Sequence, residues 1–159
     1  MSWIKDLENE RKDIKKVELW LIDKLKLDKL EDANIVDQVE NDIDLIGWVS
    51  GRRIAIEVKI RHKDYGDFLL EETSNTTTKS KGWIYKSQAE LLVYAIIENE
   101  SLTFINILDL SALREWWIRE GIYHNYSEWF GGTDNLYETL NYAIPWKDIP
   151  RDIIFFRGI

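Results

Sequence analysis

Asp44, Glu57 and Lys59 are the three side chains of this sequence whose types and spacing could perform chemistry together. Successive side chains of a strand point to opposite faces, so Glu57 and Lys59 share one face of a strand whose other face is apolar. Two carboxylates placed side by side repel each other unless one binds a proton or both share a cation. Carboxylate oxygens suit a hard cation such as Mg²⁺. The pattern predicts a cation or phosphate site, and its simpler alternative is a solvated strand face with a surface ion pair.

A β-hairpin would bring these three groups together. The pair Ser50-Gly51 fits a two-residue turn, because glycine accepts the positive φ that such turns require. With that loop Asp44 lies opposite Glu57, at a Cβ separation of about 4.5–5.5 Å. A three-residue loop would place the two acids on opposite faces, and a four-residue loop would place Asp44 opposite Lys59.

Composition narrows the possible chemistry. The chain has 159 residues, a net charge of −8 and no cysteine, which excludes disulfides, thiolate zinc sites and cysteine nucleophiles. Its two histidines, His62 and His124, argue against a histidine-rich metal site, and there is no Gly-rich phosphate loop. Residues 52–97 form the one net-positive third, with 8 basic and 6 acidic side chains. We find no secretory signal and no apolar run long enough to span a membrane, and therefore expect a cytoplasmic protein.

The elements that must position these groups follow an α/β order. Apolar spacing and turn residues predict one domain with a mixed central β-sheet flanked by helices. Pro145 indicates an edge position for the last strand, since proline cannot donate a backbone hydrogen bond. The predicted elements are a helix near 5–30, a short strand or lead-in at 35–39, the hairpin over 41–59, a strand at 65–72, a polar loop at 73–81, a helix at 85–98, a strand at 102–108, a helix over 114–119 capped by Asp109 or Ser111, and a strand at 142–146.

Two polar residues interrupt the apolar stripes of the two longest predicted helices. Glu18 lies among the apolar residues of the first helix, and Gln88 among those of the second. A carboxylate in an apolar stripe is costly to bury without a partner. The simpler explanations are a rim position for Glu18 and a core amide bonded to backbone for Gln88. Together the two residues suggest a polar pocket where the helices meet the acidic face of the hairpin.

With these residues in place, the chain resembles the PD-(D/E)xK nuclease superfamily, and in particular its small phage- or virus-type or resolvase-like members. The superfamily motif is an acid on one strand followed by Glu-x-Lys on the next, which Asp44 and Glu57-Val58-Lys59 match. The proline that often precedes the acid is absent. The resemblance implies a restriction-endonuclease-like core with the order α-β-β-β-α-β.

Two further residues and the extent of the chain complete the resemblance. Glu18 resembles the first-helix glutamate of some branches, and Gln88 resembles the polar residue on the helix after the core strands. The whole chain, residues 1–159, then forms one nuclease-like domain. Its core covers about residues 10–110, and an aromatic-rich extension covers 111–159.

The resemblance implies a deoxyribonuclease, endo- or exonuclease, that needs Mg²⁺ or Mn²⁺ to hydrolyse phosphodiester bonds. Lys59 would orient the attacking water or stabilise charge in the transition state. Glu18 would bind a second metal ion or a water, and Gln88 would position Lys59 or the phosphate. Asp42 is the alternative first acid, and Glu71 is a weaker additional one. The metal ion would be held by the carboxylates of Asp44 and Glu57 and by the backbone carbonyl of Val58.

The implied partner is nucleic acid, with DNA favoured, in the host cytoplasm if the chain is viral. Basic residues of the positive third would contact its backbone. These are Arg52, Arg53, Arg61, Lys63, Lys79, Lys81 and Lys86. Aromatic residues crowd the last third, where we favour core or dimer packing over base stacking. A homodimer suits an enzyme that cuts two strands.

Two alternatives to a nuclease stay open. One is a catalytically inactive nuclease-fold module that binds nucleic acid or protein. The other is an acidic interaction protein without a nucleic-acid role, which would not bind DNA even at low salt.

Overall fold

A computed structural model describes residues 2–132 and 137–158, and within them the chain forms four α-helices and ten β-strands. The helices are α1 (Ser2–Leu25), α2 (Ile35–Glu40), α3 (Trp83–Lys86) and α4 (Leu110–Arg119). The strands are β1 (Lys29–Asp32), β2 (Leu45–Val49), β3 (Arg52–Arg61), β4 (Asp67–Asn75), β5 (Ser80–Lys81), β6 (Leu91–Glu98), β7 (Ser101–Asp109), β8 (Ser127–Gly131), β9 (Thr139–Pro145) and β10 (Ile154–Gly158). Short 3-10 turns cover Gly121–His124, Trp146–Asp148 and Arg151–Ile153.

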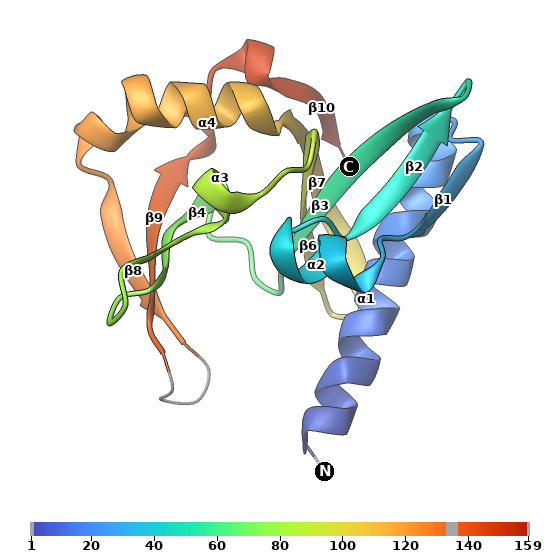
Figure 1. The fold of residues 1–159 in the computed structure, drawn as a ribbon, viewed down its shortest axis with the longest axis horizontal. Coiled ribbons are helices and arrows are strands. Elements are labelled where there is room, and N and C mark those ends of the chain that lie inside the picture. Colours follow the sequence, from blue (N-terminus) through green and yellow to red (C-terminus); the bar gives the residue numbers. More distant parts are fainter. Residues whose placement is uncertain (1, 133–136, 159) are drawn as a thin grey trace.

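The strands form two sheets. The larger has the order β1-β2-β3-β6-β7-β10, and the smaller has the order β5-β4-β9-β8. Strand β3 runs parallel to β6, while the other neighbours in the larger sheet are antiparallel. Figure 1 shows α1 beside the larger sheet with its N-terminal turns projecting beyond the strands, and α4 lying across the top of the smaller sheet. The prediction of an α/β fold with a mixed central sheet is confirmed.

The β2–β3 hairpin has the predicted turn and register. Ser50 and Gly51, with φ of 50° and 79°, are the two turn residues, and both lie in the left-handed region that a type I′ turn requires. Val49 pairs with Arg52, and the pairing runs from there to the first residue of β2. The backbone N–H of Ser50 also donates to Asp28, at 2.7 Å, which ties the turn to the segment before β1.

Helix α1 covers the apolar face of the hairpin. Its side chains Val17 and Leu21 are fully buried against apolar residues of β3, β6 and β7. The helix predicted near residues 5–30 is confirmed in type, but it ends earlier, at Leu25. Lys26 adopts φ of 52°, a left-handed conformation that commonly ends helices, and β1 begins three residues later.

The helix predicted over residues 85–98 is wrong. The segment contains the end of the one-turn helix α3 and then the strand β6, which lies between β3 and β7. Six of its eight residues are buried, because the strand is central and both of its faces are covered. A short run that is apolar on every side has no period that separates helix from strand. Leu91, Leu92 and Ala95 are spaced as on one face of a helix, but in a segment buried on both faces this spacing does not distinguish a helix from a strand.

Three smaller predictions are also corrected, and one open alternative, the cap of α4, is settled. Residues 35–39 form part of helix α2 rather than a strand, because Asn34 caps it by accepting from the Asp37 N–H at 2.8 Å. The predicted loop at 73–81 instead holds the end of β4, a turn and β5. Strand β9 lies between β4 and β8, and Pro145 is tolerated as its last residue, beyond the pairing with β8. Asp109, not Ser111, caps α4 by accepting from Ala112 at 3.0 Å.

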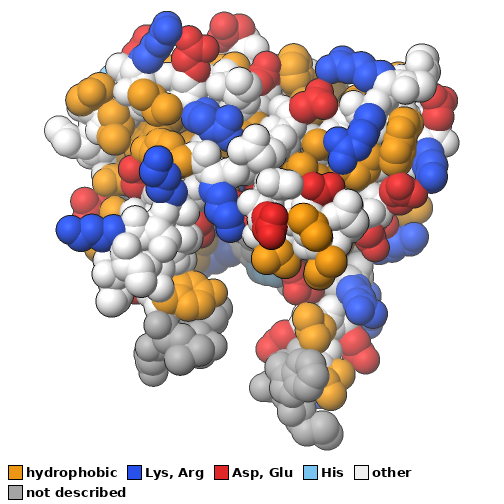
Figure 2. All heavy atoms as spheres, viewed as in Figure 1, with side chains coloured by type: hydrophobic (Ala, Val, Ile, Leu, Met, Phe, Trp, Pro, Cys, Tyr) orange, Lys and Arg blue, Asp and Glu red, His pale blue; other side chains and the backbone are white. Residues whose placement is uncertain are grey.

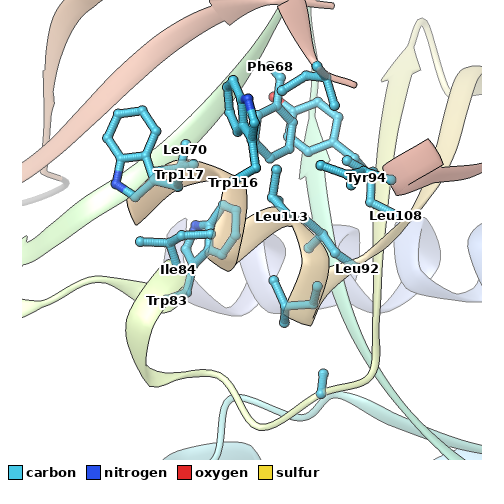
Figure 3. Close-up of a cluster of buried hydrophobic side chains, with 14 of the residues drawn as sticks. Phe68, Leu70, Trp83, Ile84, Leu92, Tyr94, Leu108, Leu113, Trp116 and Trp117 are labelled. Carbon is cyan, nitrogen blue, oxygen red and sulfur yellow. The ribbon is translucent and has the colours of Figure 1, made fainter. Parts of the chain in front are cut away.

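A shared aromatic core joins the two sheets to α3 and α4. Figure 3 shows this cluster, which includes Phe68, Leu70, Trp83, Ile84, Leu92, Tyr94, Leu108, Leu113, Trp116 and Trp117. One half-buried carboxylate at its margin is satisfied, since Glu72 accepts from Tyr85 and from the indole N–H of Trp117, each at 2.7 Å. Within the described ranges, no helix combines the length and apolar character needed to cross a membrane.

Candidate active site

Asp44 lies at the point where β2 begins and is anchored to β3 through backbone. Its N–H donates to the carbonyl of Ile56 at 2.9 Å, and its carboxylate accepts from the N–H of Val58 at 2.7 Å. The N–H and C=O of one strand residue point toward the same neighbouring strand, so the Val58 carbonyl also faces the Asp44 side of β3. The β2–β3 pairing ends with Leu45 opposite Ile56, and Asp44, one residue earlier, lies close enough for its charge to raise the pKa of Glu57. Burial raises the pKa of Asp44, and the Val58 N–H and the Lys59 charge oppose that shift.

Glu57 is the most deeply buried acid of the site, with only 1% of its surface exposed. Its Oε1 lies 2.7 Å from the ammonium of Lys59, while its Oε2 has no hydrogen-bond partner among the described residues. Burial raises the pKa of Glu57, although the charge of Lys59 acts against it. For Lys59, burial alone would lower the pKa, but the attraction of Glu57 outweighs burial and the pKa is raised. The attraction therefore favours the charged form of Lys59, whereas burial favours the neutral form of Glu57.

Glu71, on β4, is a third carboxylate that the fold brings to Lys59. Its Oε1 accepts from the backbone N–H of Trp83 at 3.2 Å, and the Lys59 ammonium lies 5.8 Å from the centre of the Trp83 ring. Burial raises the pKa of Glu71, and Lys59 and the Trp83 N–H oppose the shift. The sequence ranked Glu71 only as a weaker additional acid, because the pairing of its strand could not be known. Three acids with raised pKa values around one lysine are typical of functional sites.

Glu18 and Gln88 lie away from this cluster. Burial and the nearby Asp32 raise the pKa of Glu18, which also forms an ion pair with Lys15 at 3.8 Å. Gln88 is exposed in the segment between α3 and β6, where its amide donates to the carbonyl of Lys86 at 3.3 Å. The structure thus brings together Asp44, Glu57 and Lys59 of the predicted catalytic residues, and leaves Glu18 and Gln88 apart.

The acid of α1 that faces Asp44 is Glu10, two turns before Glu18. Its charge contributes to the raised pKa of Asp44. Glu10 and Asp44 both line a cleft of about 490 Å³ between the N-terminal half of α1 and the C-terminal end of β3. Val58, Ile60 and His62 line the β3 side of the same cleft. Helical periodicity identified the helix that supplies an acid to the site, but it could not show which turn of that helix lies beside the start of β2.

The segment before β6 is fixed beneath Glu57 by Arg114 of α4. The Arg114 guanidinium donates to the carbonyl of Ile84 at 2.6 Å and to that of Ser87 at 2.5 Å. The Ser87 hydroxyl, which lies beside Glu57, donates its one proton to the carbonyl of Asp42 at 3.1 Å. Arg114 therefore positions one wall of the site from outside it.

Few oxygen atoms near Asp44 could serve as ligands of a hard divalent cation. They are the Asp44 carboxylate, the Glu57 oxygen without a partner and the Val58 carbonyl. Protein sites for Mg²⁺ often supply only one or two carboxylates and leave the remaining positions to water and phosphate. Residues 2–132 and 137–158 contain no group of three Asp, Glu, His or Cys side chains placed to hold one metal ion. Any ion at this site therefore depends on ligands beyond the carboxylates.

The seven predicted backbone-contacting residues do not form one basic surface. Four are paired with acids, in the pairs Arg52–Glu90, Arg53–Asp37, Arg61–Asp67 and Lys86–Asp42. Lys63 and Lys81 lie over the rings of Tyr65 and Tyr85, and Lys79 is exposed in the β4–β5 turn. On the face shown in Figure 2, lysine and arginine side chains are scattered among acidic ones.

Comparisons with protein-family models, curated proteins and solved structures gave no match for this chain. The function must therefore be argued from the geometry of the site.

Proposed function

We propose that this protein is a metal-dependent nuclease that hydrolyses phosphodiester bonds in DNA. The observation that carries the proposal is the environment of Glu57, a fully buried carboxylate with one oxygen on Lys59 and the other without a partner. An unsatisfied buried carboxylate oxygen destabilises a fold. Local features that oppose stability are expected where function requires them.

Each residue of the cluster has a role in this proposal. Asp44, Glu57 and the Val58 carbonyl hold a Mg²⁺ or Mn²⁺ ion, which when bound polarises phosphate and acidifies water. Lys59 is 36% exposed at its side chain, so it can reach a phosphate oxygen and stabilise the negative charge that develops there. Glu71 keeps Lys59 protonated and restricts its position. These roles agree with the superfamily that the motif resembles.

The test is cleavage of single- and double-stranded DNA in the presence of Mg²⁺ or Mn²⁺. Glu57→Gln and Lys59→Ala are expected to reduce the rate about 10²–10³-fold, the loss typical of removing one preorganised charge-stabilising group. The control is Glu115→Gln on the exposed face of α4, where Glu115 pairs with Arg119. Cleavage that survives both site substitutions would refute the assignment of the site.

One observation favours a second candidate, a nuclease-fold module that binds nucleic acid or protein without cutting it. The Lys59 ammonium occupies one Glu57 oxygen, and the described residues offer no three-acid metal cluster. Calorimetric titration with Mn²⁺ separates the two candidates. Binding with a defined stoichiometry that Asp44→Asn abolishes supports the nuclease. No Mn²⁺ binding, together with retained affinity for DNA, supports the module.

A further inference from the structure

A row of three side chains crosses the smaller sheet from the candidate active site to the sheet's open edge. Glu71 of β4 pairs with Asn141 of β9, and Asn141 pairs with Trp129 of β8. Residues directly opposite each other on neighbouring strands point to the same face. Because neighbouring strands lie about 4.7–4.9 Å apart, the Trp129 backbone lies about 10 Å from that of Glu71. One sheet face therefore connects the Lys59 cluster with Trp129.

An exposed aromatic pair with adjacent cations ends this row. Trp129 is 49% exposed and Tyr65 is 52% exposed, and their ring centres lie 6.3 Å apart. The guanidinium of Arg61 lies 4.8 Å from the centre of the Tyr65 ring, and the Lys63 ammonium lies 5.1 Å from it. Arg61 is held in place by an ion pair with Asp67 at 2.7 Å. Other aromatic side chains of the last third are exposed as well, so the adjacent cations are what distinguishes this pair.

We propose that Trp129 and Tyr65 form a stacking site for unpaired bases of single-stranded nucleic acid. Aromatic faces bind bases of any sequence, and nearby cations bind the connecting phosphates. Lys63 supplies the phosphate contact, whereas Arg61, already paired, fixes the Tyr65 ring. The inference rests on the proposed function and adds a substrate class to it, namely DNA or RNA with an unpaired segment next to the cleaved bond. A fully paired duplex covers its base faces and cannot stack on these rings.

Strand β8 supplies a matched control for this site. Phe130 follows Trp129 and is 54% exposed, but adjacent strand residues point to opposite faces of the sheet. Phe130 therefore lies on the face away from Glu71. Removing either ring takes a similar apolar area from the same edge strand, and only one of them belongs to the proposed site.

The experiment is fluorescence anisotropy of the full chain with a labelled oligothymidylate and with a duplex of the same length. It is run at low salt and with EDTA, so that no cleavage occurs. We expect tighter binding to the single strand. Trp129→Ala is expected to weaken it at least tenfold, which corresponds to about 1.4 kcal/mol. Trp129→Phe should retain most of the affinity, and Phe130→Ala should leave it unchanged.

Three results would overturn the proposal: equal losses for Trp129→Ala and Phe130→Ala, duplex binding as tight and as sensitive to Trp129, or a dimer in sedimentation that only Trp129→Ala dissociates. The outcome is independent of catalysis because divalent metal is absent. If the protein binds single strands through Trp129 but cleaves nothing with Mg²⁺ or Mn²⁺, only the proposed nuclease function is refuted. If the protein cleaves DNA and Trp129→Ala leaves its binding to single strands unchanged, only the proposed stacking site is refuted.

Discussion

Replacing Lys59 by methionine is expected to destabilise this protein far more than loss of an exposed lysine. Glu57 is 1% exposed, and Lys59 is its only ion-pair partner among the described residues, at 2.7 Å. Removing one member of a buried pair typically costs about 3–5 kcal/mol. Because the Lys59 side chain is 36% exposed and partly screened by water, the lower end of about 3 kcal/mol applies. For a chain of this size that loss lowers Tm by roughly 6–12 °C.

The assay is thermal unfolding followed by circular dichroism in EDTA, at pH 8 and at pH 5. Burial raises the pKa of Glu57 above its ordinary 4.5, and without Lys59 less opposes that rise. The loss of stability caused by Lys59→Met should therefore shrink as the pH falls and Glu57 takes up a proton. Adding Glu57→Gln to Lys59→Met should recover most of the stability. Lys15→Met, whose pair with Glu18 spans 3.8 Å at an exposed position, should cost at most about 1 kcal/mol. The reasoning fails if both lysine substitutions cost the same, or if the double substitution recovers nothing.

Three further predictions concern the walls of the site. Asp44→Asn is expected to raise Tm at pH 8 without metal, because burial raises the pKa of Asp44 and the charged carboxylate destabilises the fold. This gain in Tm should vanish as the pH falls to 3.8, the ordinary pKa of aspartate, where the carboxylate is protonated in the folded protein. Arg114→Ala removes two charge-assisted bonds to carbonyls and should cost about 2–4 kcal/mol in urea unfolding. Gly82→Ala should cost more than about 2 kcal/mol in the same assay, because its Cβ would lie 2.2 Å from the Glu71 carbonyl oxygen.

Controls for these predictions come from exposed positions. Asp23→Asn, at a position 70% exposed, should change Tm little at any pH. Arg119→Ala removes only an exposed pair within α4 and should cost less than about 0.5 kcal/mol. Gly51→Ala adds a Cβ with no atom within 4 Å, so it reports backbone strain at φ of 79° alone, on the order of 1 kcal/mol. The geometry of the site would be contradicted if Gly82→Ala raised the free energy of unfolding, or if the change in Tm caused by Asp44→Asn did not depend on pH.

The hairpin was the part of the fold that local sequence determined most completely. Alternation assigned the faces of β3, and the Ser50-Gly51 turn set the register that brings Asp44 to Glu57. Both signals act over a few residues, so they do not depend on the rest of the chain. The error over residues 85–98 has the opposite origin. Strand β6 is buried on both faces, and its apolar run carries no information about which sheet neighbours will cover it.

The remaining parts of the site depended on tertiary packing. Gln88 was assigned to the site only because of the expected helix, and it is exposed once that segment is a loop and a strand. Glu18 lies on the predicted helix, but Glu10 faces Asp44, since the position at which α1 crosses the sheet is set by long-range contacts. Glu71 reaches Lys59 because β4 leaves the larger sheet and pairs with β9, a strand about 70 residues later in the chain.

That last pairing has a consequence for the order in which the site can form. The strand that carries Glu57 and Lys59 finds its neighbours within residues 45–109, whereas β4 gains its long partner only from residues 139–145. Contacts between distant segments form late, because closing a long loop is entropically costly. During synthesis the lysine and its first carboxylate can be in place before the Glu71 strand is fixed. A growing chain therefore carries an incomplete site until β9 has emerged.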